Sequence, residues 1–259
     1  MSYKISFPVP TIRVEKLPEL YESIDKSFTQ DEWEIIFIGP HAIPAELERK
    51  SNVKYIQDWG SPSRCRQIGL IHSEGDWMCY AADDVLFFPG ALDRAYDKIK
   101  VADYKTAILG KYTEGNRENP LMLTDDYYRM DFHDAFKEVQ RHLSKTYYLF
   151  QSGLVSSKMI KEIGGWDCQF QTCAMACVDL SMRLQNNGVE IIMTDEPLFH
   201  ASHMEGTTGD HAPIHYAQTL YDEPLFKLMY SCPAGAQRVK IGLDNWQDAP
   251  SKWEKRFGK

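Results

Sequence analysis

The first hundred residues alternate between short apolar strands and amphipathic helices, and this order constrains the fold more than any other feature of the chain. Strands are predicted over the apolar segments 3–10, 33–39, 53–59 and 76–84. Helices are predicted after each of them, over 14–28, 43–50, 61–73 and 89–100. Such alternation is typical of an α/β fold, in which a mainly parallel sheet carries helices on both faces.

The remainder of the chain follows a less regular pattern. Strands are expected at 106–114, at the start of 147–165 and at 189–195. Helices are expected around 131–143, at the end of 147–165 and at 178–188. Residues 232–259 are polar with isolated tryptophans, and we assign no structure to them.

Composition restricts the class of protein. The 259 residues, of which 43% are hydrophobic, suffice for one large or two small domains. A net charge of −8 argues against a general basic face for nucleic acid or an anionic membrane. We find neither a signal peptide nor an apolar run long enough for a membrane span. Six cysteines without a paired framework indicate reduced thiols, so we expect a cytoplasmic protein.

Two adjacent carboxylates, Asp83 and Asp84, end the predicted strand at 76–84 between apolar neighbours. Like charges repel, and desolvation at a strand end makes the repulsion worse. A divalent cation removes this conflict, because hard cations take oxygen ligands. Ligands of parallel sheets bind at the carboxyl ends of the strands, where this pair falls. The alternative is a turn whose carboxylates cap the helix after Pro89.

Two arginines, Arg64 and Arg66, lie near the start of the predicted helix at 61–73. Cations beside the free N–H groups of a helix start suit an anion such as a diphosphate. The glycine-rich phosphate loops GxGxxG and GxxxxGK[ST] are absent from the sequence, so a bound nucleotide needs another device. The alternative is a solvated helix face.

The segment 200–211 holds three histidines, an aspartate and two glycines after a predicted strand. His200 and His203 are candidate metal ligands, and the glycines predict a mobile lid over 204–211. A surface loop with incidental histidines is an equal alternative. Cys168, Cys173 and Cys177 do not match the spacing of a zinc site, and we interpret them as buried and inert.

Several motifs, taken in order, resemble the GT-A type nucleotide-sugar glycosyltransferases. The resemblance is strongest to the large inverting family that includes cellulose-synthase-like and rhamnosyl-transferring enzymes, and it covers about residues 3–203. It rests on "ISFPVPTIRVEKLPELYESI", "WEIIFIG", "SRCRQIGLIHSEGDWMCYAADDVLFFPGAL", "IGGWDCQF" and "VDLSMRLQNNGVEI". The most specific parts are Arg-x-x-Gly, Asp-Asp before Pro-Gly-x-Leu, Gly-Gly-Trp-Asp and Asp-Leu-x-x-Arg-Leu.

The resemblance implies a GT-A (Rossmann-like) domain over 1–215 that binds a nucleotide-sugar donor, a UDP- or GDP-sugar. Its nucleotide-sugar half would be 1–100 and its acceptor-side half 101–215, with an extension over 216–259. The donor residues implied are Pro8, Val9 and Pro10 at the base, Arg64 and Arg66 at the diphosphate, and Asp83. The other implied residues are Asp83, Asp84 and His200 or His203 for Mn²⁺ or Mg²⁺, and Trp166 and Asp167 for the acceptor.

The sequence departs from the family pattern at three places. The first Asp of the usual Asp-x-Asp is Ala81, and Gly39-Pro40 replaces the acidic residue after the second strand. The family's Glu-Asp pair would fall on Ala176 and Cys177. Asp179, expected at the start of its helix, is therefore our predicted catalytic base, since an inverting transfer needs a carboxylate to accept the acceptor's proton. Its alternative role is to cap or brace that helix.

The predicted function is metal-dependent transfer of a sugar, with inversion, to an acceptor that the sequence does not identify. Two alternatives remain open. One is a metal-dependent nucleotide hydrolase or nucleotidyltransferase that uses Asp83, Asp84 and the two histidines. The other is a non-catalytic nucleotide- or sugar-binding protein on the same fold, which the missing acidic pair would explain.

Overall fold

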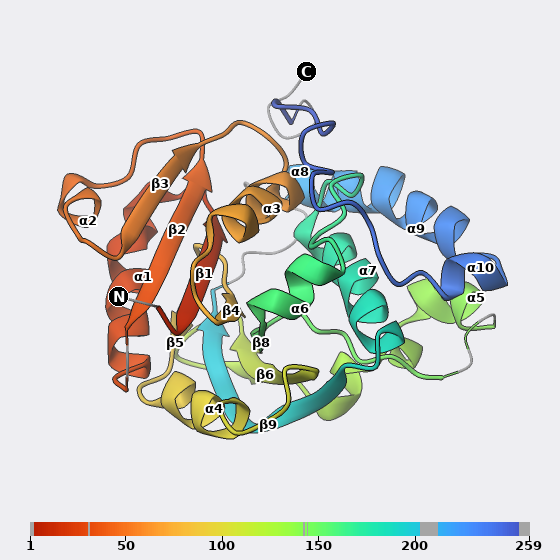
Figure 1. The fold of residues 1–259 in the computed structure, drawn as a ribbon, viewed down its shortest axis with the longest axis horizontal. Helices are drawn as coiled ribbons and strands as arrows, with labels where there is room; N and C mark the ends of the chain where they lie inside the picture. The colour runs from red at the N-terminus through yellow and green to blue at the C-terminus, as the bar shows by residue number, and fades with distance from the viewer. Residues whose placement is uncertain (1–2, 31, 142, 144, 203–211, 254–259) are drawn as a thin grey trace.

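A single mixed sheet runs through the computed structural model, which describes residues 3–30, 32–141, 143, 145–202 and 212–253 (Figure 1). The strand order is β3-β2-β1-β4-β8-β6-β9-β5, and β7 pairs with β6. The strands are β1 (Ile5–Pro10), β2 (Trp33–Gly39), β3 (Val53–Gln57), β4 (Trp77–Tyr80), β5 (Val85–Phe87), β6 (Thr106–Glu114), β7 (Leu121–Met122), β8 (Gly153–Ser156) and β9 (Glu190–Ala201).

The first four strands along this order are parallel, with Ile5 opposite both Trp33 of β2 and Trp77 of β4. Beyond β4 the sheet becomes mixed, because β8 is antiparallel to β4 and β6, whereas β6 and β9 are parallel. The α/β fold class is therefore confirmed. The parallel half brings the carboxyl ends of β1, β2 and β4 to one edge of the sheet.

The helices cover both faces of the sheet. α1 and α4 contact each other and one face, while α3 and α6 contact each other and the opposite face (Figure 1). The α-helices are α1 (Leu17–Ser27), α2 (Ala45–Glu48), α3 (Pro62–His72), α4 (Ala91–Ile99), α5 (Lys137–Gln140), α6 (Ser157–Glu162), α7 (Cys173–Asn186), α8 (Ala212–Ala217), α9 (Glu223–Tyr230) and α10 (Pro233–Ala236). The 3-10 helices are η1 (Val14–Lys16), η2 (Asp125–Tyr128), η3 (Met130–Phe132) and η4 (Asp134–Phe136), and η6 (Gln218–Asp222) is a π-helix.

Three sequence predictions of local structure need correction. The strand predicted over 76–84 ends at Tyr80 as β4, and Asp83 and Asp84 lie in the turn that precedes β5. The helix predicted over 178–188 begins earlier, at Cys173, because the Thr172 side chain caps it. The helix predicted over 131–143 is broken into η3, η4 and the short α5.

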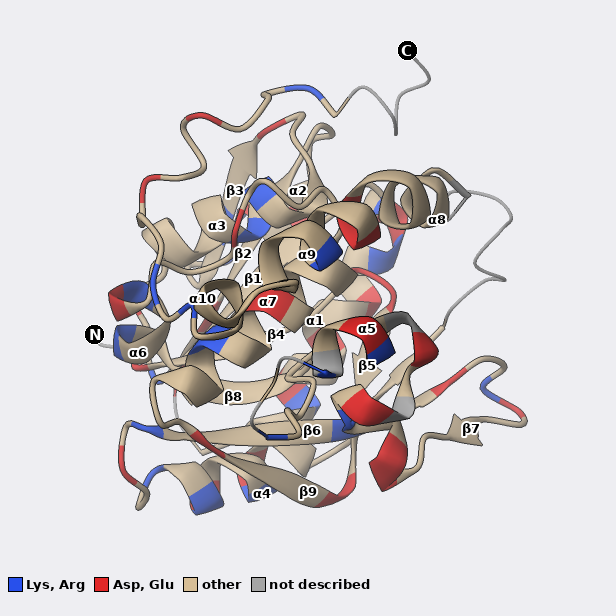
Figure 2. Cartoon of the chain, turned by 90° about the vertical axis from the view of Figure 1, so that its right-hand side faces the viewer, with Lys and Arg blue, Asp and Glu red and all other residues tan. Residues whose placement is uncertain are grey.

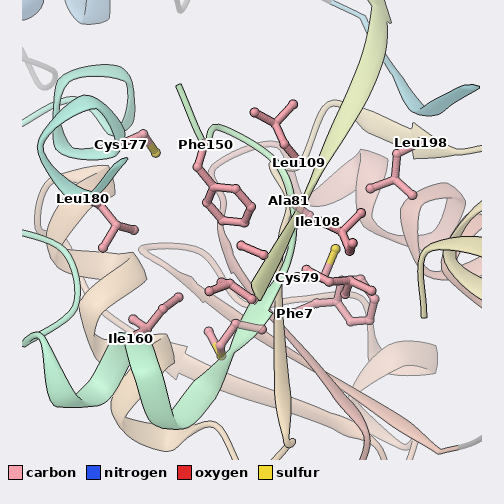
Figure 3. Close-up of a cluster of buried hydrophobic side chains, with 14 of the residues drawn as sticks. Phe7, Cys79, Ala81, Ile108, Leu109, Phe150, Ile160, Cys177, Leu180 and Leu198 are labelled. Atoms are coloured by element: carbon pink, nitrogen blue, oxygen red, sulfur yellow. The ribbon is translucent and has the colours of Figure 1, made fainter. Parts of the chain in front are cut away.

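The core lies between the sheet and the helices on each face. Figure 3 shows Leu180 of α7 and Phe150 packed against a cluster that includes Phe7 and Cys79 of the central strands. All four side chains are buried, with at most 3% of their surface exposed. Burial of this continuous cluster is the main favourable term for the fold.

Residues 237–253, here called the C-terminal strap, return from α10 across α6 and α7 to α3 (Figure 1). The strap is held by hydrogen bonds to the main chain, with Ile241 N donating to Ile163 O at 3.1 Å and Gln67 Nε2 donating to Leu243 O at 2.8 Å. The expected boundary at residue 215 falls inside α8. Residues 212–253 are therefore packed onto the sheet-bearing part of the chain.

Charged residues are distributed over the outer elements of the molecule. Figure 2 shows acidic and basic segments intermixed along the helices and loops of this face. Among the described residues, no helix combines the length and the apolar character that crossing a membrane requires.

Candidate active site

A cavity of about 470 Å³ lies at the carboxyl ends of β1, β2 and β4. One part of its wall comes from these strand ends and the start of α3, and includes Pro10, Gly39, Pro40, Pro62, Arg66 and Tyr80. The other part is mainly aromatic and apolar, and includes Tyr112, Tyr127, Phe136, Leu149, Met175 and Phe199. Within the described chain, three carboxylates line it, those of Asp83, Asp84 and Glu114.

Asp83 and Asp84 are buried in the cavity wall, with 3% and 5% of their surface exposed. The Asp83 carboxylate accepts hydrogen bonds from Thr11 Oγ1 at 3.0 Å and from the main-chain N–H groups of residues 12 and 13 at 3.1 Å. The Arg13 guanidinium binds Asp83 Oδ1 and lies 3.3 Å from Asp84 Oδ2. In this structure, Arg13 and main-chain donors therefore relieve the repulsion between the two carboxylates.

Arg66 reaches the cavity because α3 packs closely on β1. A Cβ at Gly69 would lie 2.5 Å from Pro8 Cβ, so a side chain there would push the helix away. The Arg66 guanidinium lies 3.0 Å from the centroid of the Tyr80 ring, and its Nη1 lies 3.4 Å from Cys177 Sγ. Its Nε has no hydrogen-bond partner, although the side chain is only 3% exposed.

Burial lowers the pKa of Arg66, while nearby Cys173, Cys177 and Asp84 act in the opposite direction. An arginine remains charged even so, since its ordinary pKa is above 12. Burial of a cation that has no hydrogen-bonded carboxylate in the described chain carries a desolvation cost. A ligand that brings negative charge would satisfy it.

Arg64 does not line the cavity, so its geometry does not support the predicted place at a diphosphate. Its Nε lies 3.1 Å from both carboxylate oxygens of Asp58, and its Nη1 donates to Trp246 O and, at 2.8 Å, to Ala249 O. Its guanidinium also lies 5.3 Å from the Trp246 ring centroid. The side chain anchors the C-terminal strap to α3.

Arg64→Met should lower the free energy of unfolding by about 2–4 kcal/mol, because Asp58 and the strap carbonyls lose their buried partner. UDP affinity should stay within about twofold of wild type, since Arg64 does not line the cavity. Urea unfolding and calorimetric titration measure the two quantities. Arg49→Met, at an exposed position, is the control. If Arg64→Met were as stable as wild type but had lost its affinity for UDP, Arg64 would again be the residue expected to bind the diphosphate.

Of the three residues expected at the nucleotide base, only Pro10 lines the cavity. Pro8 and Val9 are buried within β1. Pro8 instead contacts the glycine of the Arg-x-x-Gly motif, as described above. The main chain of residues 10–13 follows β1 along the cavity wall.

Trp166 and Asp167 are buried behind the wall and do not line the cavity, so their predicted contact with an acceptor is not supported. The Trp166 ring stacks on the Tyr80 ring, with centroids 5.7 Å apart. Asp167 Oδ2 binds Arg238 Nη2 at 2.7 Å. In the Gly-Gly-Trp-Asp motif, Trp166 therefore supports the Tyr80 ring by stacking. Asp167 binds Arg238 at the start of the C-terminal strap.

Asp179 lies in the second turn of α7 and not at its start, which corrects the sequence prediction. It is fully buried, and it does not line the cavity. Its Oδ2 accepts from Arg183 at 2.7–2.8 Å, and its Oδ1 accepts from Tyr230 Oη at 2.6 Å and Arg238 Nη1 at 2.8 Å. These contacts belong to a bracing residue and leave no oxygen directed at a substrate.

His200 does not line the cavity, so its geometry does not support the predicted role of metal ligand. Its Nε2 donates to Gly115 O at 3.1 Å, and its Nδ1 lies 2.9 Å from Thr113 Oγ1. His203 and the lid predicted over 204–211 lie outside the described residues. No group of three or more His, Cys, Asp or Glu side chains able to hold a metal occurs in the part of the chain that is described.

Sequence reasoning assigned no role to Arg13, Tyr80 and Glu114, which all line the cavity. Arg13 and Tyr80 lie in segments that carry the resemblance, outside its most specific parts. Cys177 also lines the cavity, with Sγ 2.7 Å from Tyr80 Oη. Burial raises the pKa of the Cys177 thiol to about 11, against an opposing effect of Arg66. The thiol is therefore neutral at pH 7 and does not replace the acidic residue that the resemblance expects there.

The parallel half-sheet, the mixed second half and a cavity at the carboxyl edge define a GT-A type α/β fold. Solved structures with the same fold include S. aureus TarS 1–349 in complex with UDP-GlcNAc, with a TM-score of 0.58 and 17% sequence identity over 94% of this chain and 69% of that one. The UDP complex gives 0.57 and 16% over 82% and 62%. At this identity the likeness establishes the fold.

This chain spans 42% of a longer structure of S. aureus TarS, with a TM-score of 0.58, 16% identity and 88% of this chain covered. It spans 60% of TarS 1–349 in another structure. No family model matches the sequence, and neither does any curated protein.

Proposed function

We propose that this chain is a glycosyltransferase that moves a sugar from a nucleoside diphosphate donor to an acceptor hydroxyl, with inversion at the anomeric carbon. The observation that carries the proposal is Arg66, a buried cation in the wall of a cavity at the carboxyl edge of a GT-A type fold. TarS structures with this fold bind UDP and UDP-GlcNAc. UDP-sugars are therefore the first donors to test.

Arg66 would bind the donor diphosphate and stabilise it as the leaving group. Negative charge grows on the leaving oxygen as its bond to the sugar breaks, so a fixed cation at that point lowers the barrier. The side chain is already held by Tyr80 and Cys177. It therefore needs little reorganisation during the reaction.

The carboxylates of the cavity could hold a divalent cation together with a bound diphosphate, whose oxygens would complete the coordination of the metal. Mg²⁺ bound to nucleotides needs one or two protein carboxylates, and phosphate oxygens and water supply the rest. Asp84 lines the cavity and could supply such a carboxylate through Oδ1, since Arg13 lies 3.3 Å from its Oδ2. Both oxygens of the neighbouring Asp83 accept hydrogen bonds from Arg13, Thr11 and the main chain. When bound, Mn²⁺ or Mg²⁺ would neutralise charge on the diphosphate.

Asp84→Asn tests the metal. Mn²⁺ should tighten UDP binding by wild type by at least about tenfold, or about 1.4 kcal/mol, and should leave binding by the variant unchanged. Calorimetric titration of UDP with and without Mn²⁺ measures both. Asp76→Asn, at a side chain that is 57% exposed, is the control. Equal, metal-independent binding by wild type and variant would contradict the metal proposal.

The activity itself is tested by UDP and GDP release from a panel of nucleotide sugars, with and without carbohydrate acceptors. The proposal expects turnover that an acceptor accelerates. Turnover that ignores every acceptor would favour a hydrolase. Tight nucleotide binding without any turnover would favour a non-catalytic binding protein.

A further inference from the structure

The mechanism lacks a base, because Asp179 is buried outside the cavity and Cys177 is a neutral thiol. Of the cavity carboxylates in the described chain, Asp83 and Asp84 lie together on Arg13, at the proposed diphosphate and metal. Glu114 lines the cavity from the end of β6, two places along the sheet from β5.

Sheet register fixes how far Glu114 lies from the aspartates. Glu114 is opposite Ala201 of β9, and Ala201 is opposite Val85 of β5, which directly follows Asp84. Neighbouring strands are about 4.8 Å apart, so the backbone of Glu114 is about 10 Å from that of Val85. This separation leaves room for a sugar between a diphosphate at Asp84 and a base at Glu114.

The surroundings of Glu114 combine aromatic rings with polar groups. Burial raises the pKa of Tyr127, and the negative charge of Glu114 adds to the rise. Tyr112 Oη donates to Gln151 Oε1 at 3.2 Å, and Tyr112, Tyr127 and Gln151 all line the cavity. Aromatic faces with nearby hydrogen-bonding groups suit an acceptor that presents hydroxyls on an apolar framework, as a carbohydrate does.

His200 contacts both neighbours of Glu114, the Gly115 carbonyl and the Thr113 hydroxyl. Because a carbonyl oxygen only accepts, His200 Nε2 carries the proton that it shares with Gly115 O. In the neutral ring, Nδ1 then accepts from the Thr113 hydroxyl. Glu114 thus lines the cavity from a strand end at which both neighbouring residues are hydrogen-bonded to His200.

We propose that Glu114 is the general base of this chain, an inference that rests on the proposed transferase function. Its carboxylate takes the proton of the acceptor hydroxyl while the acceptor oxygen bonds to the anomeric carbon. The bond from that carbon to the phosphate oxygen breaks, and its electron pair stays on the diphosphate. The products are the glycosylated acceptor, the nucleoside diphosphate and a proton on Glu114 that later passes to water.

Glu114→Gln preserves the shape of the side chain and removes the base. Turnover should fall by about 10²-fold or more, and UDP affinity and melting temperature should stay near wild type. The probe is UDP release from UDP-GlcNAc with Mn²⁺, where water replaces the acceptor and the same base is needed. Glu118→Gln, an exposed carboxylate four residues further on, is the matched control.

The pH profile separates a base from a merely structural carboxylate. A general base gives wild-type kcat/KM an acid limb, and residual turnover by the variant should lack that limb. Near wild-type turnover by a folded Glu114→Gln, or an unchanged acid limb, would overturn the inference. If wild type releases no nucleotide from any donor in the panel, the proposed function fails instead.

Discussion

Replacing Arg66 with methionine should weaken UDP binding by about 10- to 100-fold and at the same time stabilise the unliganded protein. The loss of affinity follows from removing charge-assisted hydrogen bonds to the diphosphate, each worth about 1.5–3 kcal/mol. The gain in stability has a different source. Burying an ion costs several kcal/mol, whereas the desolvated cation–π contact with Tyr80 returns about 2 kcal/mol.

Calorimetric titration of UDP and urea unfolding of the free protein measure these opposite changes. Arg49→Met, on the surface, controls for the loss of one positive charge. A variant that is less stable and binds UDP normally would show that Arg66 serves packing. It would also remove the observation on which the proposed function depends.

Asp179→Asn should lower the free energy of unfolding by about 3–5 kcal/mol, because the change leaves buried cations without their counter-charge. Both carboxylate oxygens are engaged, by Arg183 on one side and by Tyr230 and Arg238 on the other. The fold joins α7, α9 and the strap through this one side chain. The folded fraction of the variant should bind UDP as wild type does.

Urea unfolding measures the loss, and Asp25→Asn, at an exposed position of α1, is the control. A variant with wild-type stability and turnover reduced about 10²-fold would return Asp179 to the role of base. Comparison with Glu114→Gln is then decisive, since only one of the two substitutions should remove the acid limb of the pH profile.

The parallel half of the fold was predictable because its signals are local. Each strand there is a short apolar run, and each connection carries its own helix start, such as Ser61 with Pro62 before α3. The positions of Arg66 and the Asp83-Asp84 pair at the cavity were also predictable from local sequence, because each lies at or shortly after the carboxyl end of a predicted strand. Any residue near the carboxyl end of a parallel strand lies near that edge.

The direction of individual side chains was not predictable, because it depends on partners distant in sequence. Asp83 is bound by Arg13, 70 residues away. Arg64 and Arg66 are two residues apart on α3, yet one turns to the strap and the other to the cavity. His200 was mistaken for a ligand because a sequence pattern does not show that both ring nitrogens already have partners.

The C-terminal strap sets an order of events during synthesis. Ala249 O is the acceptor for Arg64, which precedes it by 185 residues, and Trp253 N donates to Trp59 O across a similar interval. At about 5–20 residues per second, the ribosome delivers these partners roughly 10–40 s after the start of α3. Until then Arg64 lacks its strap partners, and the part of the chain already synthesised lacks these long-range contacts.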